Sequence, residues 1–242
     1  MDDIIEKFKS LRLKNCALNV PEVIEQSARE NLSSLQTIDR LLDIEIGCRE
    51  KARIELRFKQ SKLGEKTTID QFNFNHDPSR RKEKTRILNL VDLNFIENKK
   101  DIILIGNPGT GKTMLSKCIA YAATQAGLKT LFTTAMDMIN QLVAAKQDHT
   151  LLKKLKQYES QDLLVCDEIG YLPLGRQGSN LFFQVISARH EKKSTIITTN
   201  LPFAKWGNIF DGTTSAAAIA DRLVYNSEVL ILEGESYRKR CG

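Results

Sequence analysis

Five short, continuously apolar segments constrain the fold of this chain more than any other feature of its sequence. They are separated by longer stretches with helical periodicity, and they span residues 101–105, 129–133, 163–167, 194–198 and 229–232. A strand that is apolar at every position is buried on both faces, as in a parallel sheet covered by helices. We therefore expect an α/β fold with a five-stranded parallel sheet flanked by helices.

The composition of the 242-residue chain suits one α/β domain with a smaller attachment. Apolar residues make up 41% of the chain, which is enough to build a core. No apolar run approaches the roughly 20 residues of a membrane helix, and the first residues lack the apolar region of a signal peptide. The five cysteines include no CxxC pair, which indicates reduced thiols rather than disulfides or a zinc site. We therefore expect a cytoplasmic protein with no membrane partner.

The sequence pattern changes near residue 65 and predicts two domains. Residues 1–65 carry apolar stripes at helical spacing, which indicates a small helical N-terminal domain in which Pro21 starts or interrupts a helix. Residues 66–242 form the α/β domain, and its first part, 66–86, reads as a linker. The sequence stops about ten residues after the last apolar segment, so we expect no large C-terminal helical lid.

The chain carries a net charge of +6, and its basic residues gather at 49–62 and again at 80–86. Such an excess favours a nucleic acid or another anionic surface as partner. The first cluster is equally compatible with the solvated face of an amphipathic helix and with a helix that contacts phosphates. The sequence leaves both interpretations open.

The sequence GNPGTGKT fits the phosphate-binding loop (P-loop) GxxxxGK[ST] at every fixed position. Its glycines allow successive N–H groups to turn toward phosphate oxygens, and the helix that follows offers its positive N-terminus. Lys112 would reach the β- and γ-phosphates, and Thr113 would bind Mg²⁺ through its hydroxyl. The expected ATP-binding residues are Gly106, Asn107, Pro108, Gly109, Thr110, Gly111, Lys112 and Thr113.

The apolar segment at 163–167 supplies the second half of such a site. It ends in Asp167, which would deliver a carboxylate to the metal ion beside the loop. The adjacent Glu168 would polarise a water molecule that attacks the γ-phosphate. A later apolar segment leads to Asn200, whose amide would either hold that water or simply end a strand before Leu-Pro.

Two motifs of GTPases also occur, DxxG at 167–170 and NKxD at 98–101. NKxD reads guanine from a loop that follows the P-loop, whereas here it precedes the first apolar segment. The order of the motifs therefore favours ATP over GTP. We expect an ATPase that hydrolyses ATP to ADP and phosphate.

Together these motifs resemble the AAA+ superfamily of ATPases, and within it the IstB/DnaC-like branch. The similarity to IstB-like helper ATPases of insertion sequences extends over nearly the whole chain. Its most specific stretches are DEIGYLP at 167–173 and TTNLPFAKWGNIF at 198–210, whereas many families share the P-loop. The resemblance implies an AAA+ sheet of the additional-strand type that binds ATP and Mg²⁺.

The resemblance also implies roles for three further residues. Asn200 would be the sensor-1 residue, Arg222 the arginine finger and Arg238 the sensor-2 arginine. Without the family, both arginines would read as ordinary surface cations. The resemblance further implies a homo-oligomer that forms on ATP and double-stranded DNA and recruits or stimulates a partner transposase. The N-terminal domain would contact DNA, the transposase or both.

Two other functions stay open. A replicative helicase loader of the DnaC type belongs to the same branch and would prefer single-stranded DNA. A nucleotide-gated module could instead recruit a partner with little turnover. Glu168 argues against the latter, because a pure binder needs no carboxylate to polarise water.

Overall fold

The computed structural model describes residues 1–234 together with residues 236 and 237. The chain forms two compact units, which span Met1–Leu56 and Arg57–Gly242. None of the helices in the described ranges is long and apolar enough to cross a lipid bilayer.

The N-terminal unit consists of helices packed around a small core. They are α1 (Asp2–Ser10), α2 (Lys14–Arg29) and the first part of α3 (Ser34–Gln60). Cys16, Val20, Val23 and Leu41 form the core. Helix α2 continues through Pro21, so the helix start or interruption expected there is wrong. Val20 and Val23 pack into the core on either side of the proline, and this packing outweighs the backbone hydrogen bond that proline cannot donate.

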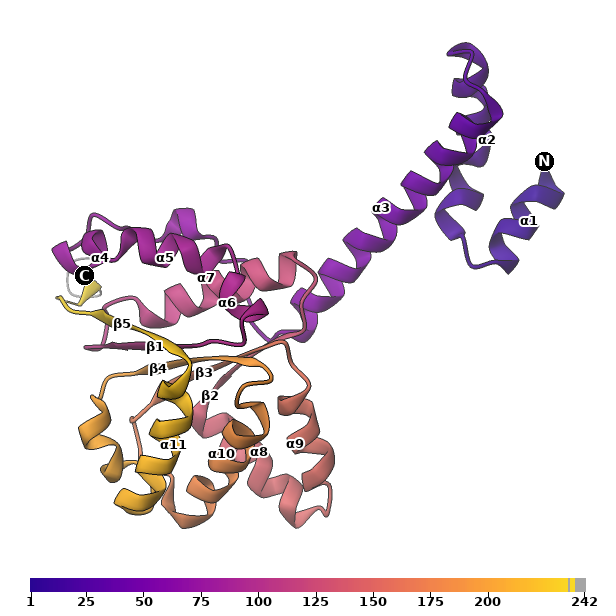
Figure 1. Ribbon diagram of the computed structural model, residues 1–242. Coiled ribbons are helices and arrows are strands. Elements are labelled where there is room, and N and C mark those ends of the chain that lie inside the picture. The colour runs from indigo at the N-terminus through magenta and orange to yellow at the C-terminus, as the bar shows by residue number, and fades with distance from the viewer. Residues whose placement is uncertain (235, 238–242) are drawn as a thin grey trace. The chain divides into compact units, whose positions relative to one another are not determined.

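The larger unit is built on a parallel sheet of five strands, which confirms the prediction from the apolar segments. The strands are β1 (Asp101–Gly106), β2 (Thr130–Thr134), β3 (Leu163–Ile169), β4 (Ser194–Thr199) and β5 (Ser227–Leu232). They lie in the order β2-β3-β4-β1-β5 (Figure 1). The carboxyl ends of β1, β3 and β4 therefore meet at one edge, where open α/β sheets bind their ligands.

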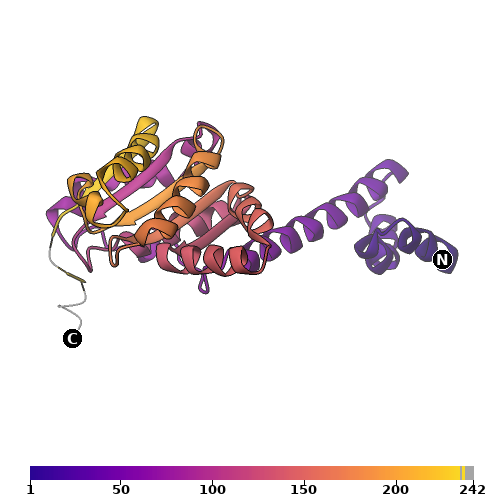
Figure 2. The same ribbon diagram turned by 90° about the horizontal axis from the view of Figure 1, so that it is seen from below.

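Helices cover both faces of this sheet (Figure 1). One layer holds α4 (Pro78–Lys82), α5 (Lys84–Val91), α6 (Asn94–Glu97) and α7 (Lys112–Gln125). The other holds α8 (Ala135–Gln147), α9 (Leu151–Glu159), α10 (Gly175–Arg189) and α11 (Thr213–Tyr225). Seen from below, the orange and yellow helices of this second layer lie in front of the strands (Figure 2). Two 3₁₀ helices, η1 (Ile69–Gln71) and η2 (Phe203–Asn208), complete the unit.

Alternate residues of β1 face the two layers. Ile102 and Leu104 belong to the core that includes Leu115 of α7, whereas Ile103 belongs to the core that includes Met138 of α8. This burial on both faces explains why each strand reads as a continuous apolar run and shows no polar alternation.

A buried guanidinium and a buried carboxylate lie near the amino-terminal ends of the strands. Arg189 donates to the carbonyl oxygens of Tyr158 at 2.7 Å and Ser194 at 2.5 Å. Asp101 accepts from the backbone N–H of Thr195 at 2.6 Å. Burial raises the pKa of Asp101 to about 7, against the opposing effects of the Thr195 N–H and the Arg189 charge.

We expect Asp101 to make the stability of the fold depend on pH. An unfolded aspartate has a pKa of about 3.9, whereas the folded chain holds this proton up to about pH 7. The contribution of Asp101 to the free energy of unfolding is therefore fully present below about pH 4 and is lost as the pH rises to about 7. Each pKa unit of the shift corresponds to ~1.4 kcal/mol.

The variant Asp101→Asn keeps an acceptor oxygen for the Thr195 N–H but does not titrate. Denaturant unfolding at about pH 5 and about pH 8 should show a larger loss of stability in the parent protein than in the variant. Equal losses in the two proteins would contradict the raised pKa of Asp101.

Candidate functional site

The P-loop connects the end of β1 to the start of α7. Two of its glycines, Gly109 and Gly111, adopt φ angles of +82° and +96°, a conformation that side chains disfavour. A Cβ atom at Gly111 would also lie 2.7 Å from Nη2 of Arg80. Glycine is therefore required at Gly111 by both backbone conformation and close approach.

Lys112 folds back onto the loop that carries it. Its Nζ donates to the carbonyl oxygens of Gly106 at 2.7 Å and Asn107 at 2.8 Å, and the side chain is buried. Contacts within the loop thus hold the ammonium charge where it can meet the β- and γ-phosphates of a nucleotide.

A cavity of about 50 Å³ brings together residues from the P-loop and from the ends of β3 and β4. It is lined by Pro108, Gly109, Lys112, Thr113, Glu168, Tyr171, Thr198, Thr199 and Asn200. A water molecule fills about 30 Å³ in the liquid, so the cavity has room for one next to the carboxylate of Glu168. Sequence positions about 90 residues apart along the chain therefore share one site.

Asp167 and Thr113 lie side by side, although they come from β3 and α7. The Thr113 hydroxyl donates to Oδ1 of Asp167 at 3.1 Å, and the Thr198 hydroxyl donates to the same oxygen at 2.5 Å. Carboxylate and hydroxyl oxygens suit Mg²⁺, which takes one or two protein carboxylates and completes its shell with water and phosphate oxygens. The two residues predicted to hold the metal ion therefore fit it.

Glu168 is exposed at the rim of the site because β3 is irregular there. The register between β3 and β4 shifts between Cys166 and Ile169, and Glu168 has a φ of +61°. Its backbone N–H donates to the Thr198 hydroxyl at 2.9 Å. Strained conformations of this kind cluster at functional sites, where the surrounding structure enforces them.

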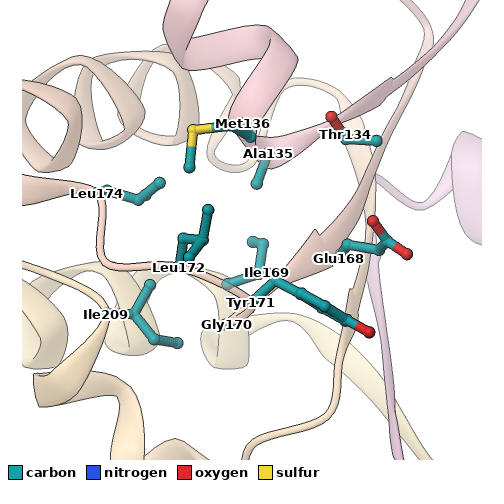
Figure 3. A pocket seen from close by; sticks show the side chains of 10 residues that line it. All are labelled: Thr134, Ala135, Met136, Glu168, Ile169, Gly170, Tyr171, Leu172, Leu174 and Ile209. Atoms are coloured by element: carbon teal, nitrogen blue, oxygen red, sulfur yellow. The ribbon is translucent and has the colours of Figure 1, made fainter. Parts of the chain in front are cut away.

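Glu168 also helps to line a second, mostly apolar pocket (Figure 3). That pocket is lined by side chains that include Met136, Ile169, Leu172 and Ile209. Figure 3 shows the Glu168 carboxylate turned away from these groups. Glu168 therefore lines both this pocket and the P-loop cavity, and its carboxylate is turned away from the apolar side chains.

Asn200 follows directly after β4 and lines the P-loop cavity. Its Oδ1 is buried and has no hydrogen-bond partner among the described residues. A buried amide oxygen without a partner is unfavourable unless a water molecule or ligand completes it. This geometry favours a role in holding water over a simple strand-ending turn.

Of the two arginines assigned by resemblance, the structure describes only Arg222. Arg222 lies on α11, where its Nη1 donates to the Ala218 carbonyl at 3.0 Å and its guanidinium covers the Phe183 ring at 4.5 Å. It is not among the residues that line the P-loop cavity. Arg238 lies outside the described residues.

The structure adds two residues that sequence reasoning missed. Thr198 contacts both Asp167 and Glu168, yet in the sequence it is one polar residue among several at the end of a strand. Arg80 reads as part of a basic surface cluster, but it is only 3% exposed and lies against the P-loop. No local sequence pattern indicates either contact, because each joins residues about 30 positions apart in the chain.

We expect Thr198→Val to impair hydrolysis more than nucleotide binding. Valine has a similar shape but can neither donate to Asp167 nor accept from the Glu168 N–H. The dissociation constant for Mg-ATP should stay within a few fold, whereas turnover should fall about tenfold or more, because the two acidic residues lose a shared anchor. Phosphate release and equilibrium nucleotide titration measure the two quantities. Thr198→Ser keeps the hydroxyl and should retain most of the turnover, and equal turnover in the valine variant would refute a positioning role.

Comparison with known proteins places this site in a family. The model of the IstB-like ATP binding proteins matches residues 6–241. The chain is 40% identical to the ATP-binding protein of insertion sequence IS5376 from Geobacillus stearothermophilus, over 89% of this chain and 85% of that one. It is 36% identical to the ATP-binding protein of insertion sequence IS232 from Bacillus thuringiensis subsp. berliner, over 94% and 90%.

Solved structures show the same fold. The crystal structure of the DnaC helicase loader matches with a TM-score of 0.56 and 26% identity, covering 69% of this chain and 96% of that one. AMPPCP-bound DnaA from Aquifex aeolicus matches with a TM-score of 0.60 and 20% identity, covering 73% and 53%. The sheet is thus an AAA+ P-loop sheet, and the chain belongs to the family of IstB-like ATP-binding proteins of insertion sequences.

Proposed function

We propose that this chain is an ATP-hydrolysing helper of transposition that oligomerises on double-stranded DNA and recruits or stimulates a partner transposase. The observation that carries the hydrolytic part is the P-loop cavity, which exposed Glu168 and Asn200 line together with the phosphate-binding residues. The Asn200 Oδ1 is buried and has no hydrogen-bond partner in the described part of the chain. The relatives named for insertion sequences support the transposition context.

In the proposed reaction ATP is the substrate and water is the nucleophile. Glu168 accepts a proton from the water as its oxygen attacks the γ-phosphorus, and Asn200 orients that water. The N–H groups of the P-loop and the Lys112 ammonium stabilise the charge on the phosphate oxygens, and ADP and inorganic phosphate leave. When bound through Thr113 and Asp167, Mg²⁺ supplies further electrostatic stabilisation of the phosphates.

The two basic clusters that favour a DNA partner are partly neutralised within the chain. In the first, Arg49 pairs with Glu45 at 2.7 Å and Arg53 pairs with Glu50 at 3.1 Å. In the second, Arg80 is buried. The two pairs support the solvated-face interpretation for part of the first cluster, and burial removes Arg80 from the surface of the second.

A third group of basic side chains lies on α9. Lys153, Lys154 and Lys156 line an open groove with Thr150, Gln157 and Ser160. Burial, with the nearby charge of Lys62, lowers the pKa of Lys154. A bound anion would reduce the repulsion between these like charges, so the lysines of α9 support contact with DNA phosphates.

A helicase loader is the second candidate, because the solved DnaC loader shares the fold over most of its own length. The two functions differ in the DNA that they prefer. A helper of transposition should favour duplex DNA, whereas a loader should favour single strands.

The function is tested with two variants of the ATP site. Glu168→Gln should bind ATP and stay on duplex DNA without turnover, because the water loses its base while Asp167 still holds the metal ion. Lys112→Ala should not bind ATP, and ATP should therefore not increase its binding to DNA. Gel shifts on duplex and single-stranded DNA, together with phosphate release, measure both effects. A preference for single strands would indicate the loader, and a parent protein without turnover on DNA would indicate a recruitment module.

A second test concerns Arg222, which we propose to act on the ATP of a neighbouring subunit. Arg222→Ala should bind ATP nearly normally but hydrolyse it slowly, because an arginine finger is worth roughly 10³-fold or more in turnover. Mixing Arg222→Ala with Lys112→Ala pairs an intact P-loop with an intact arginine at some interfaces, so phosphate release should partly recover. If the two variants co-assemble and no activity returns, Arg222 does not act between subunits.

A further inference from the structure

Arg80 is a buried cation with no role in the proposed hydrolysis. It lies in α4, and only 3% of it is exposed. Its Nε and Nη2 both donate to the carbonyl oxygen of Thr110, at 3.1 Å and 2.7 Å, and its Nη1 donates to the carbonyl of Asn73 at 3.1 Å. Burying a guanidinium costs free energy unless it is paired and hydrogen-bonded, and this one donates to a P-loop carbonyl. Because Arg80 is buried, it does not contact DNA at the surface, so its position requires another explanation.

The surroundings of Arg80 fix its side chain in one orientation. The Phe72 ring lies 4.7 Å from the guanidinium carbon, and the Tyr237 ring lies 5.6 Å from it. Asp77 places Oδ2 at 3.4 Å from Nε, which gives the buried charge a counter-ion. Lysine could not reproduce this arrangement, because only the planar fork of arginine donates twice to one oxygen while its plane meets aromatic rings.

The contact with Thr110 has a consequence for phosphate binding. In a planar trans peptide the C=O group and the following N–H group point in opposite directions. Arg80 holds the Thr110 carbonyl on its own side, so the N–H of Gly111 must point to the other side. P-loops bind phosphate through such backbone N–H groups, and Arg80 therefore sets the direction of one of them.

The same guanidinium also contacts the segment after β5. The N–H of Tyr237 donates to the Gly109 carbonyl at 2.9 Å, and its ring lies 4.8 Å from His76 as well as against Arg80. A Cβ atom at Gly234 would lie 2.9 Å from the Asp77 carboxyl carbon, so the backbone at Gly234 lies close to Asp77. Tyr237 and Arg80 further line one cavity of about 270 Å³ with Gly109, Gly111 and Lys112.

We propose that Arg80 is a positioning residue for the phosphates of a nucleoside di- or triphosphate, which orients the Thr110–Gly111 peptide and holds Tyr237 against the P-loop. The proposal rests on nucleotide binding by this chain and not on its hydrolytic or DNA-binding role. It accounts for the burial of Arg80, for the shape of the loop at Gly111 and for the contact of Tyr237 with the P-loop.

The first test compares Arg80→Lys with Arg81→Lys in the full-length protein without DNA. Both variants keep the net charge, and Arg81 is the exposed neighbour. Calorimetric titration with Mg-ADP should give a dissociation constant about tenfold or more above the parent for Arg80→Lys, the effect of losing one charge-assisted hydrogen bond from a site. Arg81→Lys should match the parent.

Thermal unfolding of the nucleotide-free proteins separates positioning from mere stabilisation. If Arg80→Lys lowers the unfolding temperature but binds Mg-ADP as the parent does, Arg80 only stabilises the fold and the proposal is overturned. Lys112→Ala in the same titration must lose binding. If it binds as the parent does, the P-loop is not the nucleotide site, and that result contradicts the proposed function itself.

A double-mutant cycle tests the link to Tyr237. Tyr237→Ala should weaken Mg-ADP binding, and adding it to Arg80→Lys should weaken binding by less than the product of the two single effects, because both act through one contact. Tyr237→Phe keeps the ring and should restore most of the binding that Tyr237→Ala loses. Fully multiplicative effects would overturn the link between Arg80 and Tyr237.

Discussion

One buried carboxylate oxygen joins the three elements that build the nucleotide site. Oδ1 of Asp167, at the end of β3, accepts from Thr113 at the start of α7 and from Thr198 on β4. Because the Thr198 hydroxyl also accepts from the Glu168 N–H, the same contacts set the backbone that carries the proposed catalytic carboxylate. The order β3-β4-β1 in the sheet makes this possible, since it places β4 between the strand that leads into the P-loop and the strand that bears Asp167.

The P-loop is held mainly through its carbonyl groups. Lys112 donates to the carbonyls of Gly106 and Asn107, Arg80 donates to that of Thr110, and the N–H of Tyr237 donates to that of Gly109. A backbone whose carbonyls are fixed by the protein presents its N–H groups in a defined direction before any ligand arrives. Such preorganisation reduces the ordering that nucleotide binding would otherwise require. The cations around the loop thus shape it as well as supply charge.

Features with a local pattern could be predicted from the sequence, whereas those that depend on tertiary contacts could not. The strands were predictable because burial on both faces leaves a continuous apolar run, as in residues 163–167. The P-loop was predictable because its function requires glycines at fixed spacing. The burial of Arg80 could not be predicted, because a run of basic residues does not indicate which of them is buried. Pro21 was misjudged because the packing of Val20 and Val23 overrides the local preference of proline.

The position of Arg222 bears on how the proposed hydrolysis would be controlled. Within one chain, Glu168 and Asn200 line the cavity beside Lys112, whereas Arg222 covers the Phe183 ring and is not among the residues that line the cavity. A second cation near the γ-phosphate would stabilise the charge that develops there, and a neighbouring subunit is a natural source for it. Glu168 and the P-loop would then make each chain competent to bind ATP and to polarise water, whereas rapid turnover would require assembly. Under the proposed function, the protein would stay in its ATP-bound form until it has oligomerised, so hydrolysis would follow assembly on DNA and not precede it.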